Sequence, residues 1–161
     1  MYKIRKPKLS EVVQLKALID SASVKGFVLP RTLEELYENV RDFYVYADES
    51  GLGGCVSLHI DMEDLAEIRT LIVRNDIRRK GIGRMLLHAV LDEARELSIP
   101  KVYVLTRCPD FFGKQGFQKT SLEQLPYKIR KDCARCPKYG ETCDEVPMIL
   151  SLNNDNNGKV L

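Results

Sequence analysis

The segment RNDIRRKGIGR (74–84) places basic side chains and two glycines directly before an amphipathic helical pattern. The first N–H groups of a helix have no partner inside the helix, and the helix dipole adds positive potential at that end. Glycines let the backbone approach a phosphate without a Cβ in the way, so the turn is suited to an anion such as a pyrophosphate. The residues concerned are Arg78, Arg79, Lys80, Gly81, Ile82, Gly83 and Arg84.

Two better-known phosphate-binding patterns do not fit this turn. The Walker pattern requires Gly-Lys-Ser/Thr after four intervening residues, and the segment lacks it. The dinucleotide fingerprint requires a third glycine, in the region where this sequence has Met85 and Leu86. A solvated basic helix start would give the same pattern, so the turn alone leaves both interpretations open.

The segment DCARCPKYGETCDE (132–145) could also carry chemistry, because it contains Cys133, Cys136 and Cys143. A closed zinc site usually needs four Cys or His ligands, and no histidine is near. A redox Cys-x-x-Cys normally opens a helix in a different fold, whereas Pro137 suits a turn. We favour packed thiols or one reversible disulfide and expect no metal, although a metal stays the open alternative.

Length and composition limit the class of protein. The chain has 161 residues, the size of one domain with a sizeable core. An apolar fraction of 44% and a net charge of +2 are ordinary for a globular protein and point to no nucleic-acid or membrane partner. The N-terminus lacks an apolar signal-peptide core, and five cysteines are an odd number for a secreted disulfide framework. We therefore expect a cytoplasmic protein.

Hydrophobic periodicity predicts the elements that must position the basic turn. Ser10 and Thr32 are expected to cap the first two helices, and three glycines between residues 51 and 54 are expected to form a turn. The order predicts one α+β domain over residues 1–152, a strongly bent mixed β-sheet flanked by helices, with a polar, disordered tail at 153–161. Strands are expected at 2–7, 43–50, 55–61, 66–73, 101–106, 117–121 and 146–152, and helices at 11–23, 33–43, 82–98 and 109–116.

The run from Arg78 to Gly83 resembles the R/Q-x-x-G-x-G/A signature of the GCN5-related N-acetyltransferases, the GNAT family. The preceding strand ending in Leu-Ile-Val and the downstream FFGKQGF (111–117) are similar as well, as is the order of elements over nearly the whole chain. The resemblance implies the GNAT fold and binding of acetyl-CoA as co-substrate. Its pyrophosphate would lie on the turn Arg78 to Arg84, and its pantetheine arm would pair with the backbone of Leu71, Ile72 and Val73.

The resemblance narrows to the short, stand-alone N-acetylglutamate synthases, in which a similar cysteine pattern occurs. The matching segments are 29–43, 66–73, 102–117 and 125–150. The implied reaction transfers the acetyl group of acetyl-CoA to the α-amine of L-glutamate, the first step of arginine biosynthesis. Glutamate has two carboxylates, which suit fork-shaped arginines. The expected substrate-binding residues are Arg31, Arg69, Arg107 and Lys128.

The expected catalytic residue is Glu67, which lies on the fourth strand and would act as a base through a water. Its alternative role is that of a structural partner for Arg69. Many acetyltransferases of this fold use a tyrosine to protonate the leaving thiolate, and here Phe112 stands at that position. The thiolate could leave without an acid, or Cys108 or Tyr127 could serve.

Two other functions stay open at this point. The acceptor could be another amino acid, a small amine or a protein, although arginines around the expected cleft favour a small acidic amine. The protein could also be a non-catalytic sensor of acetyl-CoA, because the usual tyrosine is absent. Edge strands of this fold often pair, so a homodimer is one expectation.

Overall fold

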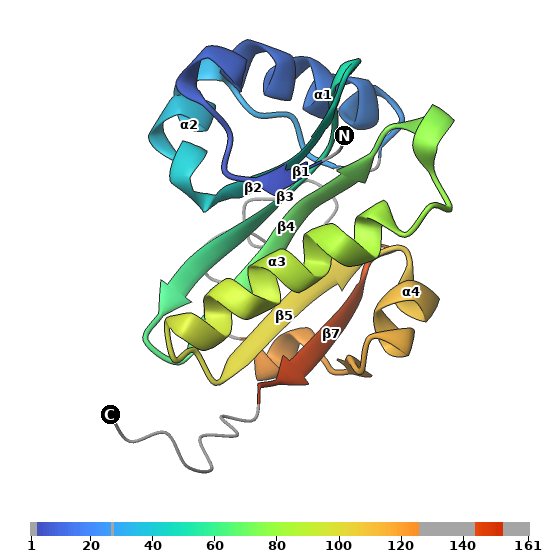
Figure 1. Cartoon of the computed structure of the whole chain (residues 1–161). Helices are drawn as coiled ribbons and strands as arrows, with labels where there is room; N and C mark the ends of the chain where they lie inside the picture. Colours follow the sequence, from blue (N-terminus) through green and yellow to red (C-terminus); the bar gives the residue numbers. More distant parts are fainter. Residues whose placement is uncertain (1–2, 27, 126–143, 153–161) are drawn as a thin grey trace. The chain divides into compact units, whose positions relative to one another are not determined.

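The computed structural model describes residues 3–26, 28–125 and 144–152. Its strands form one open, mixed sheet with the order β1-β2-β3-β4-β5-β7-β6 (Figure 1). The strands are β1 (Lys3–Arg5), β2 (Phe43–Asp48), β3 (Gly51–Met62), β4 (Leu65–Val73), β5 (Lys101–Thr106), β6 (Gln118–Lys119) and β7 (Val146–Ser151). The helices are α1 (Val12–Val24), α2 (Leu33–Glu38), α3 (Ile82–Glu96) and α4 (Pro109–Lys114).

The chain divides into two compact units. The first unit contains residues 1–59 and 68–97, and the second contains residues 60–67 and 98–161. Strands β3 and β4 therefore contribute residues to both units. The basic turn lies in the first unit, whereas β5, α4 and β7 lie in the second.

The core of the first unit forms because α1 and α2 bury one face each. On α1 the buried side chains Val12, Leu15 and Ile19 recur at intervals of three and four, as on one side of a helix. They form one cluster with Leu36 of α2 and with buried residues of β2 and β3. Thr32 caps α2 as predicted: its side chain accepts from the Glu35 N–H at 3.1 Å, and the Glu35 carboxylate accepts from the Thr32 N–H at 3.1 Å.

Helix α3 follows the basic turn and packs against β1 and β2. Its two faces differ strongly, because buried aliphatic side chains alternate with charged ones at helical spacing. The buried face anchors the start of the helix beneath the turn through Ile82, which is 4% exposed. The buried residues of α3 are Ile82, Leu86, Leu87, Val90, Leu91 and Ala94.

In the second unit β5 is the central strand. It runs parallel to the first residues of β4, from Leu65 to Glu67, and antiparallel to β7 along its whole length. Phe112 of α4 makes edge-to-face contacts with Phe111 at 5.1 Å and Phe117 at 5.3 Å between ring centroids. This aromatic cluster holds α4 in the second unit.

Three local predictions were wrong. Ser10 does not cap α1, because a short 3-10 turn over Leu9–Glu11 precedes that helix. Helix α2 ends at Glu38, and another 3-10 turn covers Val40–Asp42. The three glycines do not form the hairpin turn but begin β3, and the turn lies at residues 49–50.

Close packing explains two of those glycines. A Cβ at Gly53 would lie 2.6 Å from Ile77 Cδ1, and a Cβ at Gly54 would lie 2.9 Å from the Ile72 carbonyl oxygen. Glycine therefore lets β3 approach both the end of β4 and the segment that leads into the basic turn.

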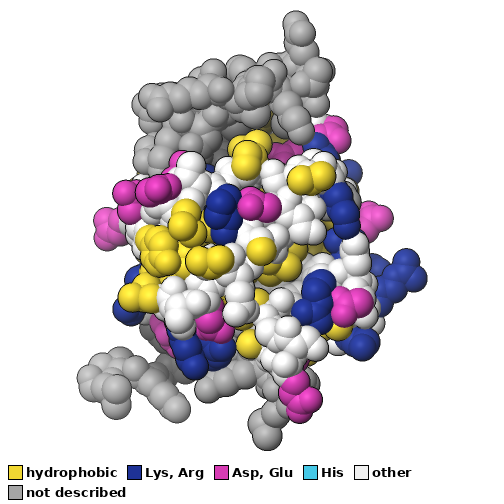
Figure 2. Space-filling view, turned by 90° about the horizontal axis from the view of Figure 1, so that it is seen from above, with side chains coloured by type: hydrophobic (Ala, Val, Ile, Leu, Met, Phe, Trp, Pro, Cys, Tyr) yellow, Lys and Arg dark blue, Asp and Glu magenta, His cyan; other side chains and the backbone are white. Residues whose placement is uncertain are grey.

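On the face shown in Figure 2, neither positive nor negative side chains predominate among the described residues. Basic and acidic side chains are intermixed there with hydrophobic ones. Around α1, for example, Leu9 and Val13 are exposed by 65% and 62%. Within the described residues, no helix is long and apolar enough to cross a bilayer.

Candidate functional site

The basic turn ends in an uncapped helix N-terminus. Gly81 is the residue before α3, with φ of +80°, a left-handed conformation that glycine adopts without a steric penalty. Gly81 has no side chain to accept from the first N–H groups of α3, which are therefore available to an anion. Arg79 also has a left-handed φ, of +64°, so the turn is tightly wound on both sides of Lys80.

The electrostatics of the turn favour a bound anion. Arg78, Arg79, Lys80 and Arg84 are all exposed at the surface. The nearby Asp76 accepts from Arg74 Nε at 2.6 Å, and this hydrogen bond lowers the pKa of Asp76. Because Arg74 already engages that carboxylate, Asp76 offsets little of the positive charge of the turn.

The strand that leads to the turn is locally strained. Thr70 on β4 has φ of +56°, which is rare for a β-branched residue. Two side chains of β3 bond to the carbonyls at this point: Ser57 Oγ donates to Arg69 O at 3.3 Å, and Cys55 Sγ donates to Thr70 O at 3.4 Å. Burial raises the pKa of the Cys55 thiol, so it stays a donor. Such strain persists where surrounding contacts hold it and is common at functional sites; here it directly precedes Leu71, Ile72 and Val73.

Glu67 is a buried carboxylate in a polar cluster of the second unit. Its side chain is 4% exposed, although glutamate is rarely buried without a partner. Glu67 on β4 and Tyr103 on β5 are direct partners in the parallel register, and Tyr103 Oη lies 3.4 Å from Glu67 Oε2. The same hydroxyl donates a hydrogen bond to Asp61 Oδ2 of β3. Two carboxylates therefore share one phenol.

The predicted substrate-binding arginines are distributed over both units. Arg31 directly precedes the α2 cap and is half-buried, and its carbonyl accepts from Lys16 Nζ at 3.0 Å. Arg69 lies on β4 beside the strained Thr70. Arg107 follows β5 in the second unit, where its Nε donates to Asp144 Oδ1 at 3.0 Å. An acidic substrate would compete with Asp144 for that guanidinium.

Phe112 occupies the position where a proton donor was expected in the resembled family, and it is 4% exposed in the aromatic cluster. Cys108, one of the two alternative donors, is exposed at the start of α4. The other alternative, Tyr127, lies outside the described residues, as do Lys128, Cys133, Cys136, Cys143 and the predicted tail.

No group of three or more His, Cys, Asp or Glu side chains suited to a metal occurs among residues 3–26, 28–125 and 144–152.

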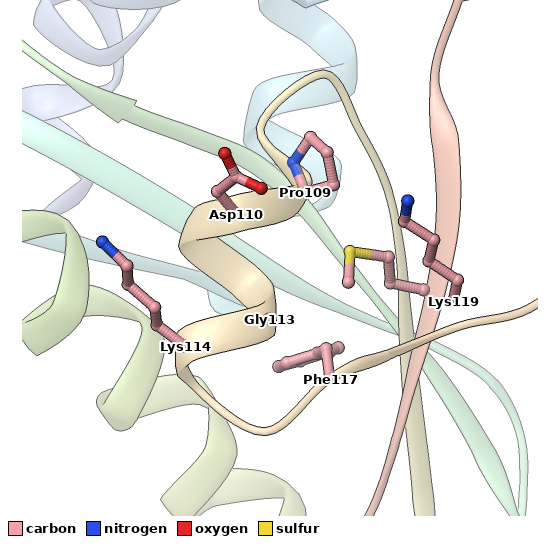
Figure 3. A pocket seen from close by; sticks show the side chains of 7 residues that line it. Pro109, Asp110, Gly113, Lys114, Phe117 and Lys119 are labelled. Carbon is pink, nitrogen blue, oxygen red and sulfur yellow. The ribbon is translucent and has the colours of Figure 1, made fainter.

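A hollow of about 530 Å³ lies on the second unit, between α4 and β7 (Figure 3). Its lining is partly apolar, with Phe117 and Met148, and partly charged, with Asp110, Lys114 and Lys119. None of the residues predicted to bind the cofactor or the substrate lines it.

Sequence reasoning missed the partners of Glu67 and the strain at Thr70. Tyr103 is the one aromatic residue in KVYVLT (101–106), a strand that reads as wholly buried. A hydroxyl placed there must find a polar partner, which is a signal that could have been used. Asp61 and Thr70 give no comparable signal, because strand register and backbone angles depend on long-range contacts.

Comparisons with known proteins identify the family and the fold. The model of the acetyltransferase (GNAT) family matches residues 15–117. An uncharacterized N-acetyltransferase of Chlorobaculum tepidum is 33% identical over 149 residues, which cover 92% of this chain and 96% of that protein. An amino-acid acetyltransferase of Mycobacterium tuberculosis is 34% identical over 139 residues, which cover 84% of this chain and 78% of that protein.

Among solved structures, N-acetylglutamate synthase from Neisseria gonorrhoeae, complexed with coenzyme A and N-acetyl-glutamate, superimposes with a TM-score of 0.84 at 27% identity. The match covers 94% of this chain and 35% of that longer one. The fold predicted from the sequence is thereby confirmed. The chain belongs to the acetyltransferase (GNAT) family, as an acyltransferase that uses acetyl-CoA.

Proposed function

We propose that this acetyltransferase transfers the acetyl group of acetyl-CoA to the α-amine of L-glutamate, a step of arginine biosynthesis. The observation that carries the proposal is the likeness over 94% of the chain to a synthase crystallised with coenzyme A and N-acetyl-glutamate. The amino-acid acetyltransferase of Mycobacterium tuberculosis supports the same class of acceptor.

The cofactor half of the proposed site lies in the first unit. The pyrophosphate of acetyl-CoA binds the N–H groups at the start of α3, with the exposed cations of the turn around it. The pantetheine arm pairs with the backbone of Leu71, Ile72 and Val73, directly after the strained Thr70. The residues of the turn in this proposal are Arg78, Arg79, Lys80, Gly81, Ile82, Gly83 and Arg84.

The acceptor half needs cations for two carboxylates. Arg31, Arg69 and Arg107 are assigned to these carboxylates, with Lys128 as a fourth contributor. Arginine suits this task because its planar fork can donate two parallel hydrogen bonds to one carboxylate. Arg107 would exchange Asp144, whose side chain is 63% exposed, for a carboxylate of the substrate.

Glu67 is the proposed base. It removes a proton from the glutamate ammonium through a water, and the amine nitrogen then attacks the thioester carbonyl carbon. The negative charge that develops on the carbonyl oxygen is stabilised by backbone N–H donors of β4. When the C–S bond breaks, the electron pair leaves with coenzyme A as thiolate, and the new amide nitrogen loses its second proton to this thiolate or to water. The hydrocarbon ring of Phe112 donates no proton to this thiolate.

The test is thiol release from acetyl-CoA, screened against the twenty amino acids. Arg31→Ala and Arg107→Ala should each raise the KM for glutamate roughly 10- to 100-fold, because each removes a charge-assisted hydrogen bond. Arg95→Ala is the matched control, since Arg95 lies on the exposed side of α3 and pairs with Asp92. Glu67→Gln should lower kcat by about 10²- to 10⁴-fold.

The outcomes separate the parts of the proposal. Turnover with another amino acid, but none with glutamate, would refute the substrate and retain the acetyltransferase. Unchanged glutamate kinetics in both arginine variants would refute the carboxylate clamp. Binding of acetyl-CoA without turnover of any amino acid would redirect the search to a protein amine or to a sensor.

A further inference from the structure

We propose that Tyr103 and Asp61 form a proton exit from Glu67, in which the phenol passes the proton of the protonated base to Asp61 and from there to solvent. The proposal rests on the proposed role of Glu67 as base. Tyr103 and Asp61 are positioning residues in this scheme, since neither is assigned a contact with the substrate.

The geometry places the three groups in sequence. Tyr103 Oη lies 3.4 Å from Glu67 Oε2 and donates a hydrogen bond to Asp61 Oδ2. A phenol has one hydrogen and further acceptor capacity on its oxygen. While that hydrogen is committed to Asp61, the oxygen remains an acceptor for a hydrogen from Glu67. A protonated Glu67 would therefore donate its hydrogen to the Tyr103 hydroxyl oxygen.

Burial gives the path a direction. Tyr103 is fully buried and Glu67 is 4% exposed, whereas Asp61 is half-buried near the end of β3, between the exposed Ile60 and Met62. The path thus runs from an almost fully buried residue to a half-buried one, where Asp61 Oδ2 receives the proton and Oδ1 is buried. The sheet itself holds the first step, because Glu67 and Tyr103 face each other in the register of β4 and β5.

The transfer balances. Glu67, protonated by the ammonium, gives its proton to Tyr103 Oη as the original phenolic hydrogen moves to Asp61 Oδ2. One O–H bond breaks and one forms at the phenol, which stays neutral. Glu67 becomes a carboxylate again, and the carboxylic acid at Asp61 releases its proton to water. Donor and final acceptor are both carboxylates, so no strong base has to be formed along the way.

Three variants distinguish a relay from a packing role. Tyr103→Phe removes the hydroxyl and keeps the buried ring. Asp61→Asn keeps an oxygen that accepts from Tyr103 but cannot take up its proton. Tyr44→Phe on β2 is the control for loss of a tyrosine hydroxyl elsewhere. The melting temperature of each variant is recorded, so that a folding defect is identified as such.

With glutamate as acceptor, we expect kcat to fall at least about tenfold in Tyr103→Phe and in Asp61→Asn, with both KM values within about twofold of the wild type. The lost kcat should return as the concentration of a small buffer base is raised, whereas the wild type should not respond. Normal kcat in Asp61→Asn, or a loss that buffer does not restore, would overturn the relay in favour of a structural hydrogen bond.

A second measurement needs no substrate. The Tyr103 hydroxyl proton is observed by NMR in the unliganded protein and assigned by its loss in Tyr103→Phe. It should resonate downfield, move upfield in Asp61→Asn and shift in Glu67→Gln. No response to Glu67→Gln would overturn the relay. Failure of the wild type to acetylate any amino acid would instead refute the proposed function, and the NMR result would then decide on the hydrogen-bonded triad by itself.

Discussion

The ion pair between Arg5 and Glu11 joins β1 to the start of α1. We expect it to make the stability of the protein depend on pH in the acidic range. Arg5 donates to both carboxylate oxygens, at 2.8 and 2.9 Å, and the Lys8 N–H donates to Oε1 at 2.7 Å. The hydrogen bond from Arg5 is the main reason that the pKa of Glu11 falls from 4.5 to about 2. This geometry is bidentate, which is the arrangement in which ion pairs contribute most.

The sign of the pH effect follows from this shift. Because the folded pKa lies below the unfolded one, the stabilisation is complete above about pH 4.5 and is lost as the pH falls through about 2. Converted in full to free energy, this pKa shift would correspond to about 3.4 kcal/mol of stabilisation at neutral pH. The Glu11 side chain is 14% and that of Arg5 24% exposed, and solvent screens a pair at the surface. We therefore expect about 1.5–2 kcal/mol.

The assay is urea unfolding of the wild type and Glu11→Gln at pH 7 and at a series of values down to pH 2. The glutamine retains an oxygen for the Lys8 N–H but carries no charge. The free-energy difference between the two proteins should be about 1.5–2 kcal/mol at pH 7 and should shrink toward zero below pH 4.5. Glu63→Gln, in the exposed turn between β3 and β4, is the control. A difference that does not change with pH would refute the reasoning.

Three further predictions concern backbone geometry. Gly81→Ala should lower the free energy of unfolding by about 1–2 kcal/mol, because an L-residue is strained at φ of +80°. It should also raise the KM for acetyl-CoA. Thermal unfolding measures the first effect, and steady-state kinetics measure the second. Gly54→Ala should lower the free energy of urea unfolding by about 1–3 kcal/mol, because its Cβ would meet a backbone oxygen at 2.9 Å. Gly113→Ala is the control and should not lower it, because its Cβ would have no atom within 4 Å. Thr32→Ala removes the Oγ1 that accepts from the Glu35 N–H, one of the two hydrogen bonds of the α2 capping box, and should lower the free energy of unfolding by about 1 kcal/mol; unchanged stability would contradict the role of the cap.

The predicted elements were largely recovered because their signals are local. Helix α3 is apparent from apolar residues at helical spacing, and the Thr32 cap from a threonine three residues before a glutamate. The glycine run between 51 and 54 was misread because glycine indicates either a turn or a close approach. The distance from Gly54 to Ile72 identifies a close approach, and that distance depends on how β3 packs.

The sequence by itself determined the basic turn and its position before α3, because both depend on neighbouring residues, whereas Glu67 as the base stays a prediction. Only the tertiary structure decided what surrounds Glu67. Asp61, Glu67 and Tyr103 come from three strands, and the phenol is 42 positions from Asp61 along the chain. Strand register brings them together, and a shift of one residue would turn Tyr103 to the other face of the sheet. No local pattern encodes that register, so the shared phenol became visible only in the folded chain.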